Sequence, residues 1–382
     1  IERIDKEFPE WETFISATTN TGFSVAEKNF SDKAVFYFPA DLSWTTRKVL
    51  LKKRPNLILL VELEIWPNFL ISAYKKNIPV IIVNGRISNR SLMAYRAISH
   101  ISKDFRNSLT NEMNTYCART EIDAQRFRDL GIPGKQVFVT GTMKYDNIPT
   151  HIDESISKGL AELFHINDDD LVLIGGSTHA GEEEILIRVF KKLNEKYQNL
   201  KLIIVPRHIE RTGDVSRLIE KMGFIPVLKT RLDGSNYNWQ NRKKEIILID
   251  TVGDLEKIYS LANYVFVGKS LVPSGGQNMM EPAGLGKPVV FGPHTFNFKE
   301  ETDLLLKNSA AKMVRTEDEL FKAIEFFIKN PDAAKEMGLK AQKVVNEKRG
   351  ATGKNIEIIG KILAKKSSGR FSARTYPFGT GG

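Results

Sequence analysis

Short apolar runs alternate along the whole chain with longer segments in which apolar residues recur at helical spacing. The runs cover residues 34–38, 57–61, 80–83, 115–118 and 137–140, and then 171–175, 201–205, 245–248, 264–267 and 288–291. Segments 181–197 and 317–328 are examples of the amphipathic helical pattern. Strands that alternate with helices are typical of parallel βαβ units. The pattern therefore predicts an α/β protein with two doubly wound, Rossmann-like sheets.

A polar stretch over residues 147–157 separates the two series of strands. The 382 residues exceed one average core, so we expect an N-terminal domain over 1–150 and a C-terminal domain over 158–366. Residues 367–382 are rich in Gly, Ser and Arg and are expected to form a tail that is disordered or foreign to the gene. Ligands of such sheets bind beyond the carboxyl ends of the strands, which predicts a site in a cleft between two facing sheets.

The net charge and the numbers of cysteines and histidines limit the kinds of partner and site that this protein can have. The net charge of +10 is spread over both halves and favours anionic partners: nucleic acid, phosphorylated substrates or a membrane surface. The single cysteine, Cys117, excludes an internal disulfide and is expected to be a buried small apolar residue. The six histidines show no metal-ligand spacing, so no metal site is predicted. No apolar run approaches the ~20 residues of a membrane-spanning helix.

The loop after the run 171–175 reads GGSTHAGEEE. Its glycines, Ser177, Thr178 and backbone amides precede a helix, which favours binding of an anion. It is neither the dinucleotide fingerprint nor a P-loop. A plain turn is the alternative, with Ser177 or Thr178 as the N-cap and the glutamates complementing the helix dipole.

Two further strand ends carry charged residues. PRHIER follows the run 201–205 and places Arg207 where a guanidinium could grip a phosphate, although a solvated arginine is an equal alternative. LIDTVGDL, residues 248–255, brings acidic groups to another strand end.

The longest of these loops, GKSLVPSGGQNMMEP, covers residues 268–282. Its backbone amides and the dipole of the following helix could hold a phosphate, while Glu281 accepts hydrogen bonds from sugar hydroxyls. This combination suits a nucleotide. A capping box formed by Asn278 and Glu281 without any ligand is the alternative.

In the first half, VELEIWPNF places Glu62 and Glu64 at alternate positions as a buried strand ends. In a strand, alternate side chains face the same side, so the two carboxylates are expected to act together. Solvated charges at the end of a strand are the alternative.

Taken in order, these motifs resemble the 3-deoxy-D-manno-octulosonic acid (Kdo) transferases of lipopolysaccharide synthesis, which are GT-B glycosyltransferases. The resemblance spans nearly the whole chain, from TTNTGFSVAEK and YFPADLSWTTRKVL through ELEIWPN, NGRISNRS and GTMKYD to GSTHAGEEE, PRHIER, DTVGDL and GGQNMMEPAGLGKPVVFGPHTFNF. It implies two Rossmann-like domains, of which the N-terminal one lacks its first βα unit here and receives a lipid acceptor. The C-terminal domain would hold the donor, CMP-Kdo.

The resemblance also assigns site residues. Arg207 is similar to the family's phosphate-gripping arginine and Glu64 to its acidic residue in the Trp-Pro motif, so the catalytic candidates are Glu64, Glu62 and Arg207. The donor-binding candidates are Ser177, Thr178, Arg207, His208, Asp254, Ser270, Gly275, Gly276, Asn278 and Glu281. Asp254, Gln277 and Lys269 stand where the family usually has Glu, His and Gly.

The implied reaction is an inverting transfer of Kdo from CMP-Kdo to a lipid A precursor, lipid IVA, without a cofactor or metal ion. The family's general base would precede Ile1, and a chain without it is expected to be inactive. The implied partners are CMP-Kdo, the precursor and an anionic membrane surface, with no nucleic acid, at the cytoplasmic face of the bacterial inner membrane. A UDP-sugar transferase or epimerase of the same fold and a non-catalytic nucleotide-binding fragment are the alternatives.

Overall fold

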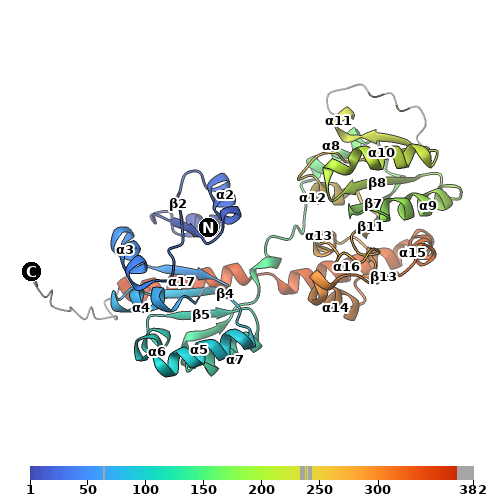
Figure 1. The fold of residues 1–382 in the computed structure, drawn as a ribbon. Coiled ribbons are helices and arrows are strands. Elements are labelled where there is room, and N and C mark those ends of the chain that lie inside the picture. The colour runs from blue at the N-terminus through green and yellow to red at the C-terminus, as the bar shows by residue number, and fades with distance from the viewer. Residues whose placement is uncertain (63–64, 233–236, 238, 240–242, 368–382) are drawn as a thin grey trace, which may run out of the picture. The chain divides into compact units, whose positions relative to one another are not determined.

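The computed structural model describes residues 1–62, 65–232, 237, 239 and 243–367 (Figure 1). The chain forms two compact units. The first comprises Ile1–Asp146 and the segment from Arg349 onward, and the second is the continuous stretch Asn147–Lys348. Each unit is an α/β structure in which the paired strands are parallel, as the alternating pattern predicts.

The first unit holds two sheets, of two strands in the order β1-β2 and four in the order β3-β4-β5-β6. Its strands are β1 Phe14–Ala17, β2 Ala34–Tyr37, β3 Ile58–Val61, β4 Val80–Gly85, β5 Thr115–Ala118 and β6 Val137–Val139. Its helices are α1 Glu2–Glu7, α2 Asn20–Asn29, α3 Ser43–Lys53, α4 Pro67–Lys75, α5 Asn89–Ile101, α6 Lys103–Leu109, α7 Glu121–Asp129 and α17 Ala351–Ser367.

The second unit holds one seven-stranded sheet in the order β13-β12-β11-β7-β8-β10-β9. The strands are β7 Leu171–Thr178, β8 Leu200–Pro206, β9 Ile225–Leu228, β10 Glu245–Leu248, β11 Tyr264–Val267, β12 Val289–Phe291 and β13 Lys312–Met313. The helices are α8 Glu154–Leu163, α9 Glu182–Asn194, α10 Thr212–Lys221, α11 Lys229–Leu232, α12 Leu255–Ile258, α13 Met280–Gly284, α14 Lys299–Lys307, α15 Glu317–Lys329 and α16 Pro331–Lys348.

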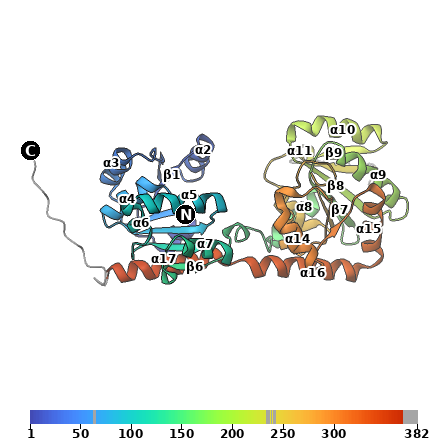
Figure 2. The same ribbon diagram turned by 60° about the horizontal axis from the view of Figure 1, so that its bottom comes forward.

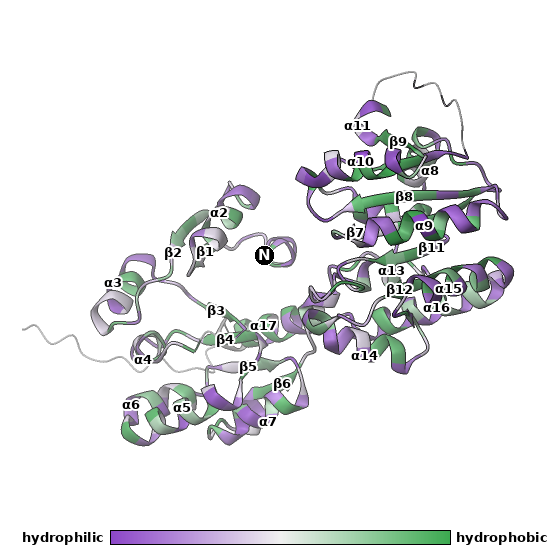
Figure 3. Ribbon diagram, turned by 45° about the vertical axis from the view of Figure 1, so that its right-hand side comes forward, coloured by the Kyte–Doolittle hydropathy of each residue, from purple (hydrophilic) through white to green (hydrophobic). Residues whose placement is uncertain are grey.

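The cores follow the hydropathy pattern. Strands β8 and β11 are largely hydrophobic along their length, whereas α9 and α15 carry both hydrophobic and hydrophilic residues (Figure 3). Leu186, Phe190 and Leu193 of α9 are completely buried, because residues three, four and seven apart share one side of a helix. Burial of such apolar side chains is the main favourable contribution to folding.

The C-terminal helix corrects the expected domain boundaries. Residues 349–366 were expected in the C-terminal domain, but α17 belongs to the first unit, where it runs along the four-stranded sheet (Figure 2). Ile359 is buried there together with Ile81, Val83 and Cys117. The boundary itself falls at 146/147, and the expected linker begins inside the second unit, where Ile148 is buried. The predicted tail, apart from Ser367, lies outside the described residues.

Cys117 confirms the expectation of a buried apolar role. Its side chain is completely buried in β5, and this burial raises the pKa of its thiol to about 12. A thiol that stays protonated at neutral pH is a poor nucleophile.

Candidate active site

The chain order of the second unit creates a switch point in its sheet. From the central strand β7 the chain moves outward through β8 to β9 and β10, and it then crosses back to β11 on the other side of β7. Loops that leave neighbouring strands in opposite directions open a crevice at their carboxyl ends, where ligands of such sheets bind. Most of the predicted donor-binding residues lie at the end of β7 and in the loops after β8 and β11.

The end of β7 is tightly packed and departs from strand geometry. Its register with β8 shifts between Gly176 and Thr178, and Ser177 adopts a φ of 51°. A Cβ on Gly176 would lie 2.0 Å from the hydroxyl oxygen of Tyr259, so only glycine fits there. Thr178 is fully buried, and its hydroxyl has no hydrogen-bond partner among the described residues.

A buried carboxylate joins the loops on the two sides of the switch point. Glu182, the first residue of α9, is fully buried. Its oxygens accept hydrogen bonds from the backbone amides of Lys269, Ser270 and Leu271 at 2.6, 2.8 and 2.9 Å. They also accept one from the amide of His179 at 2.9 Å. These three amides after β11 are therefore occupied by the protein itself, and Glu182 does more than complement the helix dipole.

Ser270 supports the same loop from within. Its hydroxyl donates to the carbonyl of Val267 at 2.6 Å and accepts from the amide of Gly292 at 2.8 Å. The side chain is completely buried. Ser270 thus fixes the loop after β11 against β12, and contact with a donor stays a prediction.

The glycine pair that follows turns the loop back. Gly275 and Gly276 have φ values of 98° and 79°, and a Cβ on Gly275 would lie 2.3 Å from the side-chain nitrogen of Asn297. Among the described residues, the amides of Gly275, Gln277, Asn278 and Met279 donate no hydrogen bond. Unlike the amides at 269–271, these amides are not used by the described residues of the protein itself. The following helix α13 has only five residues, so its dipole contributes less than the sequence suggested.

Glu281 sits in a partly buried polar cluster. Its carboxylate accepts a hydrogen bond from the amide group of Asn278 at 2.9 Å, while the oxygen of Asn278 accepts from the backbone of Met280. This is not the reciprocal capping box, because Glu281 binds the side chain of Asn278 rather than its backbone amide, and Asn278 accepts from Met280 rather than from Glu281. Burial, reinforced by the nearby Glu256 charge, raises the pKa of Glu281, and Asn278 and Arg207 oppose the shift.

The loop after β8 brings a cation to this cluster. The amide of Arg207 donates to the carbonyl of Thr178 at 3.0 Å, which anchors the loop beside β7, and Arg207 is exposed. His208 is exposed as well, and its ring lies 6.0 Å from that of His179. Arg211 is instead held by the buried Glu183 through contacts of 2.7 and 3.2 Å. Arg207 is thus close enough to influence Glu281 while remaining open to solvent.

Asp254 lies after β10 and is engaged by its own surroundings. Its carboxylate accepts a hydrogen bond from Thr251 and forms an ion pair with Lys229 at 3.5 Å. Of the predicted donor-binding residues, it stands furthest along the sheet from the switch point.

The acidic candidates of the first unit follow β3. The strand ends at Val61, and Glu62 has a φ of 64°, so the alternation that was expected to align Glu62 with Glu64 stops there. Glu62 is exposed. Glu64 lies outside the described residues.

Comparisons with known proteins fit this arrangement. A family model described as 3-deoxy-D-manno-octulosonic-acid transferase (kdotransferase) matches residues 1–147. A 3-deoxy-D-manno-octulosonic acid transferase of Haemophilus influenzae is 31% identical over 369 residues, covering 96% of this chain and 83% of the relative. The chain belongs to the Kdo transferase family. It is a glycosyltransferase, and Kdo transfer in lipopolysaccharide synthesis is its activity class.

Other matches extend the comparison. A Kdo transferase of Aquifex aeolicus is 29% identical and covers 77% of this chain and 73% of its own length. Among solved structures, a UDP-GlcNAc 2-epimerase from Neisseria meningitidis matches with a TM-score of 0.55 at 16% identity, over 95% of each chain. A glycosyltransferase from Rickettsia africae matches at 0.52 and 14%, over 94% of this chain and 92% of its own. At such identities the likeness shows the fold alone, which is GT-B.

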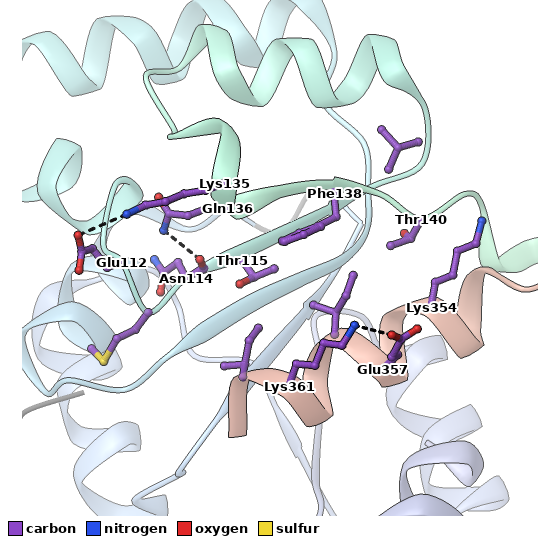
Figure 4. A pocket seen from close by; sticks show the side chains of 14 residues that line it. Glu112, Asn114, Thr115, Lys135, Gln136, Phe138, Thr140, Lys354, Glu357 and Lys361 are labelled. Atoms are coloured by element: carbon purple, nitrogen blue, oxygen red, sulfur yellow. Dashed lines mark hydrogen bonds and ion pairs between the residues drawn. The ribbon is translucent and has the colours of Figure 1, made fainter. Parts of the chain in front are cut away.

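The first unit of the transferase also contains a cavity of about 550 Å³, and none of the predicted site residues lines it (Figure 4). It lies between β5, β6 and α17, with Phe138 and Ile358 among its apolar lining. Lys135 pairs with Glu112 and Lys361 with Glu357 at its rim. These four charges are therefore already paired within the first unit.

Metal-ligating clusters and membrane-spanning helices are both absent from the part of the chain that the structure describes. It contains no group of three or more His, Cys, Asp or Glu side chains that could hold a metal ion. No helix within it combines the length and apolar character needed to cross a bilayer.

Sequence reasoning missed three groups at the site. The motif GGSTHAGEEE indicated Glu182 only as a partner of the helix dipole, although a glutamate at the first helical position after a glycine turn is also able to cap a neighbouring loop. Tyr259, whose pKa is raised well above 10 by burial and by Glu281, has no motif that could mark it. His179 lies in the same motif as Glu182, and its Nδ1 is buried without a partner among the described residues. A lone histidine has no spacing that would distinguish it in sequence.

Proposed function

We propose that the enzyme transfers Kdo from CMP-Kdo to a lipid A precursor of the lipid IVA type, with inversion, at the cytoplasmic face of the inner membrane. The observation that supports a nucleotide donor is that cationic, amide and carboxyl groups come from several loops around the β7/β11 switch point. There, Arg207 and the free amides at 275 and 277–279 supply positive charge, and Glu281 supplies a hydrogen-bonding carboxyl group. A phosphate and a sugar need these two kinds of partner.

The reaction follows from these groups. The acceptor hydroxyl attacks the anomeric carbon of Kdo, the bond from that carbon to the phosphate oxygen of CMP breaks, and a carboxylate takes the hydroxyl proton. Negative charge develops on the departing phosphate, where Arg207 and the loop amides would stabilise it. Glu62 and Glu64 are the carboxylates of the first unit that we propose for the active site.

Arg207 offers the direct test. Measured in the full-length gene product, Arg207→Ala should lower kcat for transfer of radiolabelled Kdo to a tetra-acylated precursor by about 10²-fold, because one charge-stabilising contact is lost in the transition state. Arg217→Ala is the matched control, since Arg217 is exposed on α10 and pairs with Asp214 at the surface. Unchanged turnover in Arg207→Ala would remove this arginine from the mechanism.

Calorimetry with CMP and UDP tests the donor. We expect CMP to bind and UDP to bind much more weakly, and Arg207→Ala to weaken CMP binding. Tighter binding of UDP would favour a UDP-sugar enzyme of the same fold. Binding of CMP without any transfer would favour a nucleotide-binding fragment.

A further inference from the structure

Helix α3 of the first unit has an outer surface that is both basic and apolar. None of its residues belongs to the proposed donor site. It stands at the edge of this unit, beside α4 (Figures 1 and 2). Its inner side is fixed: Thr46 and Leu50 are buried, and the Thr46 hydroxyl lies 2.9 Å from that of Ser72 in α4. The carboxylate of Asp41, just before α3, accepts hydrogen bonds from the amides of Asn68 and Phe69. The helix is therefore held rigidly with one side outward.

The outer side combines large apolar residues with cations. Trp44 is 68% exposed and Leu51 50%, and Leu42 immediately before the helix is 50% exposed. Arg47, Lys48 and Lys52 are exposed as well. Positions 44, 47, 48, 51 and 52 are spaced three or four apart, so these five side chains share one side of the helix. We call this set, with Leu42, the α3 face.

The charges of the α3 face are not neutralised locally. Residues 42–54 contain no Asp or Glu, and among the described residues neither Arg47, Lys48 nor Lys52 has an ion-pair partner. Lys53, by contrast, is turned inward, with its Nζ 4.3 Å from the centre of the Phe14 ring. Some exposed lysines elsewhere do have a partner, as Lys75 does in Asp104. An unpaired basic side on a rigid helix favours an anionic partner.

The apolar residues decide which kind of anionic partner fits. Exposed tryptophan and leucine on a basic helix are typical of helices that lie in the interface of a bilayer. The tryptophan ring sits at the headgroup level, the leucines enter the acyl boundary, and the cations meet acidic headgroups. Nucleic acid would use the cations but would leave both leucines in water.

We propose that the α3 face docks the first unit onto an anionic lipid surface. The proposal gives a location to the membrane contact that the lipid acceptor requires, and in that sense it rests on the proposed function. Its test measures vesicle binding rather than transfer, so the two can fail separately.

Cosedimentation with phosphatidylcholine vesicles, with and without phosphatidylglycerol, tests the docking. We expect binding only when phosphatidylglycerol is present, and weaker binding at high salt because exposed charges are screened. Arg47→Gln/Lys48→Gln/Lys52→Gln and, separately, Trp44→Ser/Leu51→Ser should each lower the partition coefficient by about tenfold or more. All five residues are exposed, so both variants should keep the melting temperature of the parent.

A matched control lies on α16 of the second unit. Leu339 is 55% exposed, and Lys335, Lys340 and Lys343 are exposed on the same helix. Leu339→Ser with all three lysines changed to Gln removes the same charge and should leave vesicle binding unchanged. Equal losses in the control and in the α3 variants would show that only net charge matters, and would overturn the proposal.

Two further readouts complete the test. Trp44 fluorescence should shift to shorter wavelength on anionic vesicles, and this shift should be absent in Trp44→Phe. Full vesicle binding by both α3 variants would overturn the proposal. The absence of binding to anionic vesicles would overturn it as well. A nucleic-acid surface would be indicated instead if the charge variant lost affinity for an RNA oligonucleotide while the Trp44→Ser/Leu51→Ser variant still bound vesicles normally, and that result would also overturn the proposal.

Discussion

At the scale of single residues, two adjacent glutamates at the start of α9 are buried for different purposes. Glu182 accepts hydrogen bonds from backbone amides of the loops on both sides of the switch point, and Glu183 binds the guanidinium of Arg211. A buried carboxylate is stable only when its charge is matched by hydrogen bonds or by a cation. Each glutamate therefore fixes one of the loops that surround the proposed donor site.

Glu182→Gln should loosen the loop after β11. Glutamine has the same size, but its NH₂ group cannot accept a hydrogen bond from a backbone N–H. At least one buried backbone N–H therefore loses its partner, which costs about 1–3 kcal/mol of folding free energy. We expect weaker CMP binding by calorimetry and a higher KM for the donor, with a smaller change in kcat. Glu184→Gln is the control, since Glu184 is exposed and pairs with Arg188. Unchanged donor KM in Glu182→Gln would show that the loop holds its shape without this carboxylate.

Lys287 gives a prediction for pH. Burial lowers its pKa from 10.5 to about 8, even though its Nζ donates to the carbonyl of Ser260 at 2.8 Å. Between these two values the unfolded chain binds more protons than the folded one, so this group adds stability as the pH rises through that window. Below about pH 8 the buried Lys287 is charged, and its burial lowers the free energy of unfolding by the full amount.

Lys287→Met should therefore be more stable than the parent at pH 7, by on the order of 2 kcal/mol. This advantage should shrink between about pH 8 and pH 10.5. Denaturant unfolding at a series of pH values measures it. Lys312→Met, at an exposed site in the same unit, should show no such trend. A stability difference between Lys287→Met and the parent that is independent of pH would mean that burial does not lower the pKa of Lys287.

Candidate positions for the site could be chosen from the sequence where a side chain follows a strand. Arg207 could be identified because it follows a recognisable apolar run, and the structure places it next to the β7 loop. The roles of Glu182 and Tyr259 could not be predicted, because they depend on contacts with residues distant in sequence. Glu182 accepts the amide of Lys269, and Tyr259 packs against Gly176. Partners so far apart along the chain leave no periodicity to detect.

At the scale of secondary structure, a single aspartate, Asp146, attaches the start of helix α17 to the first unit. The carboxylate of Asp146 accepts hydrogen bonds from the amides of Gly350 and Thr352 at 2.6 and 2.5 Å, at the start of α17. These amides have no partner within the helix, so a carboxylate there satisfies two donors and complements the helix dipole. Asp146, the last residue of the first segment of its unit, thus ties α17 to that unit.

Asp146→Ala should weaken this attachment. We expect a loss of about 1–2 kcal/mol in the free energy of unfolding of the first unit, which is the usual cost of removing a helix cap. Hydrogen exchange should be faster in α17 and unchanged in α9. Asp153→Ala is the control, because Asp153 caps α8 in the second unit and its loss should leave α17 unaffected. Faster exchange of both α17 and α9 in Asp146→Ala, or of neither, would contradict a local role for Asp146.

The strands could be predicted where apolar residues follow one another without interruption. All ten predicted strands are present, and β5, β10 and β11 have the expected bounds. Three others were missed: β13 has only two residues, Ser16 interrupts β1, and β9 contains a proline, Pro226. The place of α17 could not be predicted, since an amphipathic helix does not reveal which of two sheets it covers.

At the scale of the whole molecule, the two units differ in how the chain builds them. The second unit is a single continuous segment, whereas the first needs residues from both ends of the chain. In the first unit, Ile81, Val83 and Cys117 of the sheet share a core with Ile359 of α17. Without α17 this apolar surface would be exposed to water, which costs free energy in proportion to its area.

A fragment of residues 147–348 should therefore fold alone, with a cooperative melting transition and CMP affinity equal to that of the whole chain. A fragment of residues 1–146 should melt at a lower temperature or aggregate, and a peptide of residues 349–367 added in trans should raise its melting temperature. A peptide with Ile359→Asp is the control, because a charge at this position cannot enter the core. Full stability of 1–146 alone would mean that α17 merely covers a sheet that is already stable. Loss of CMP binding by a folded 147–348 fragment would mean instead that the donor site needs residues of the first unit.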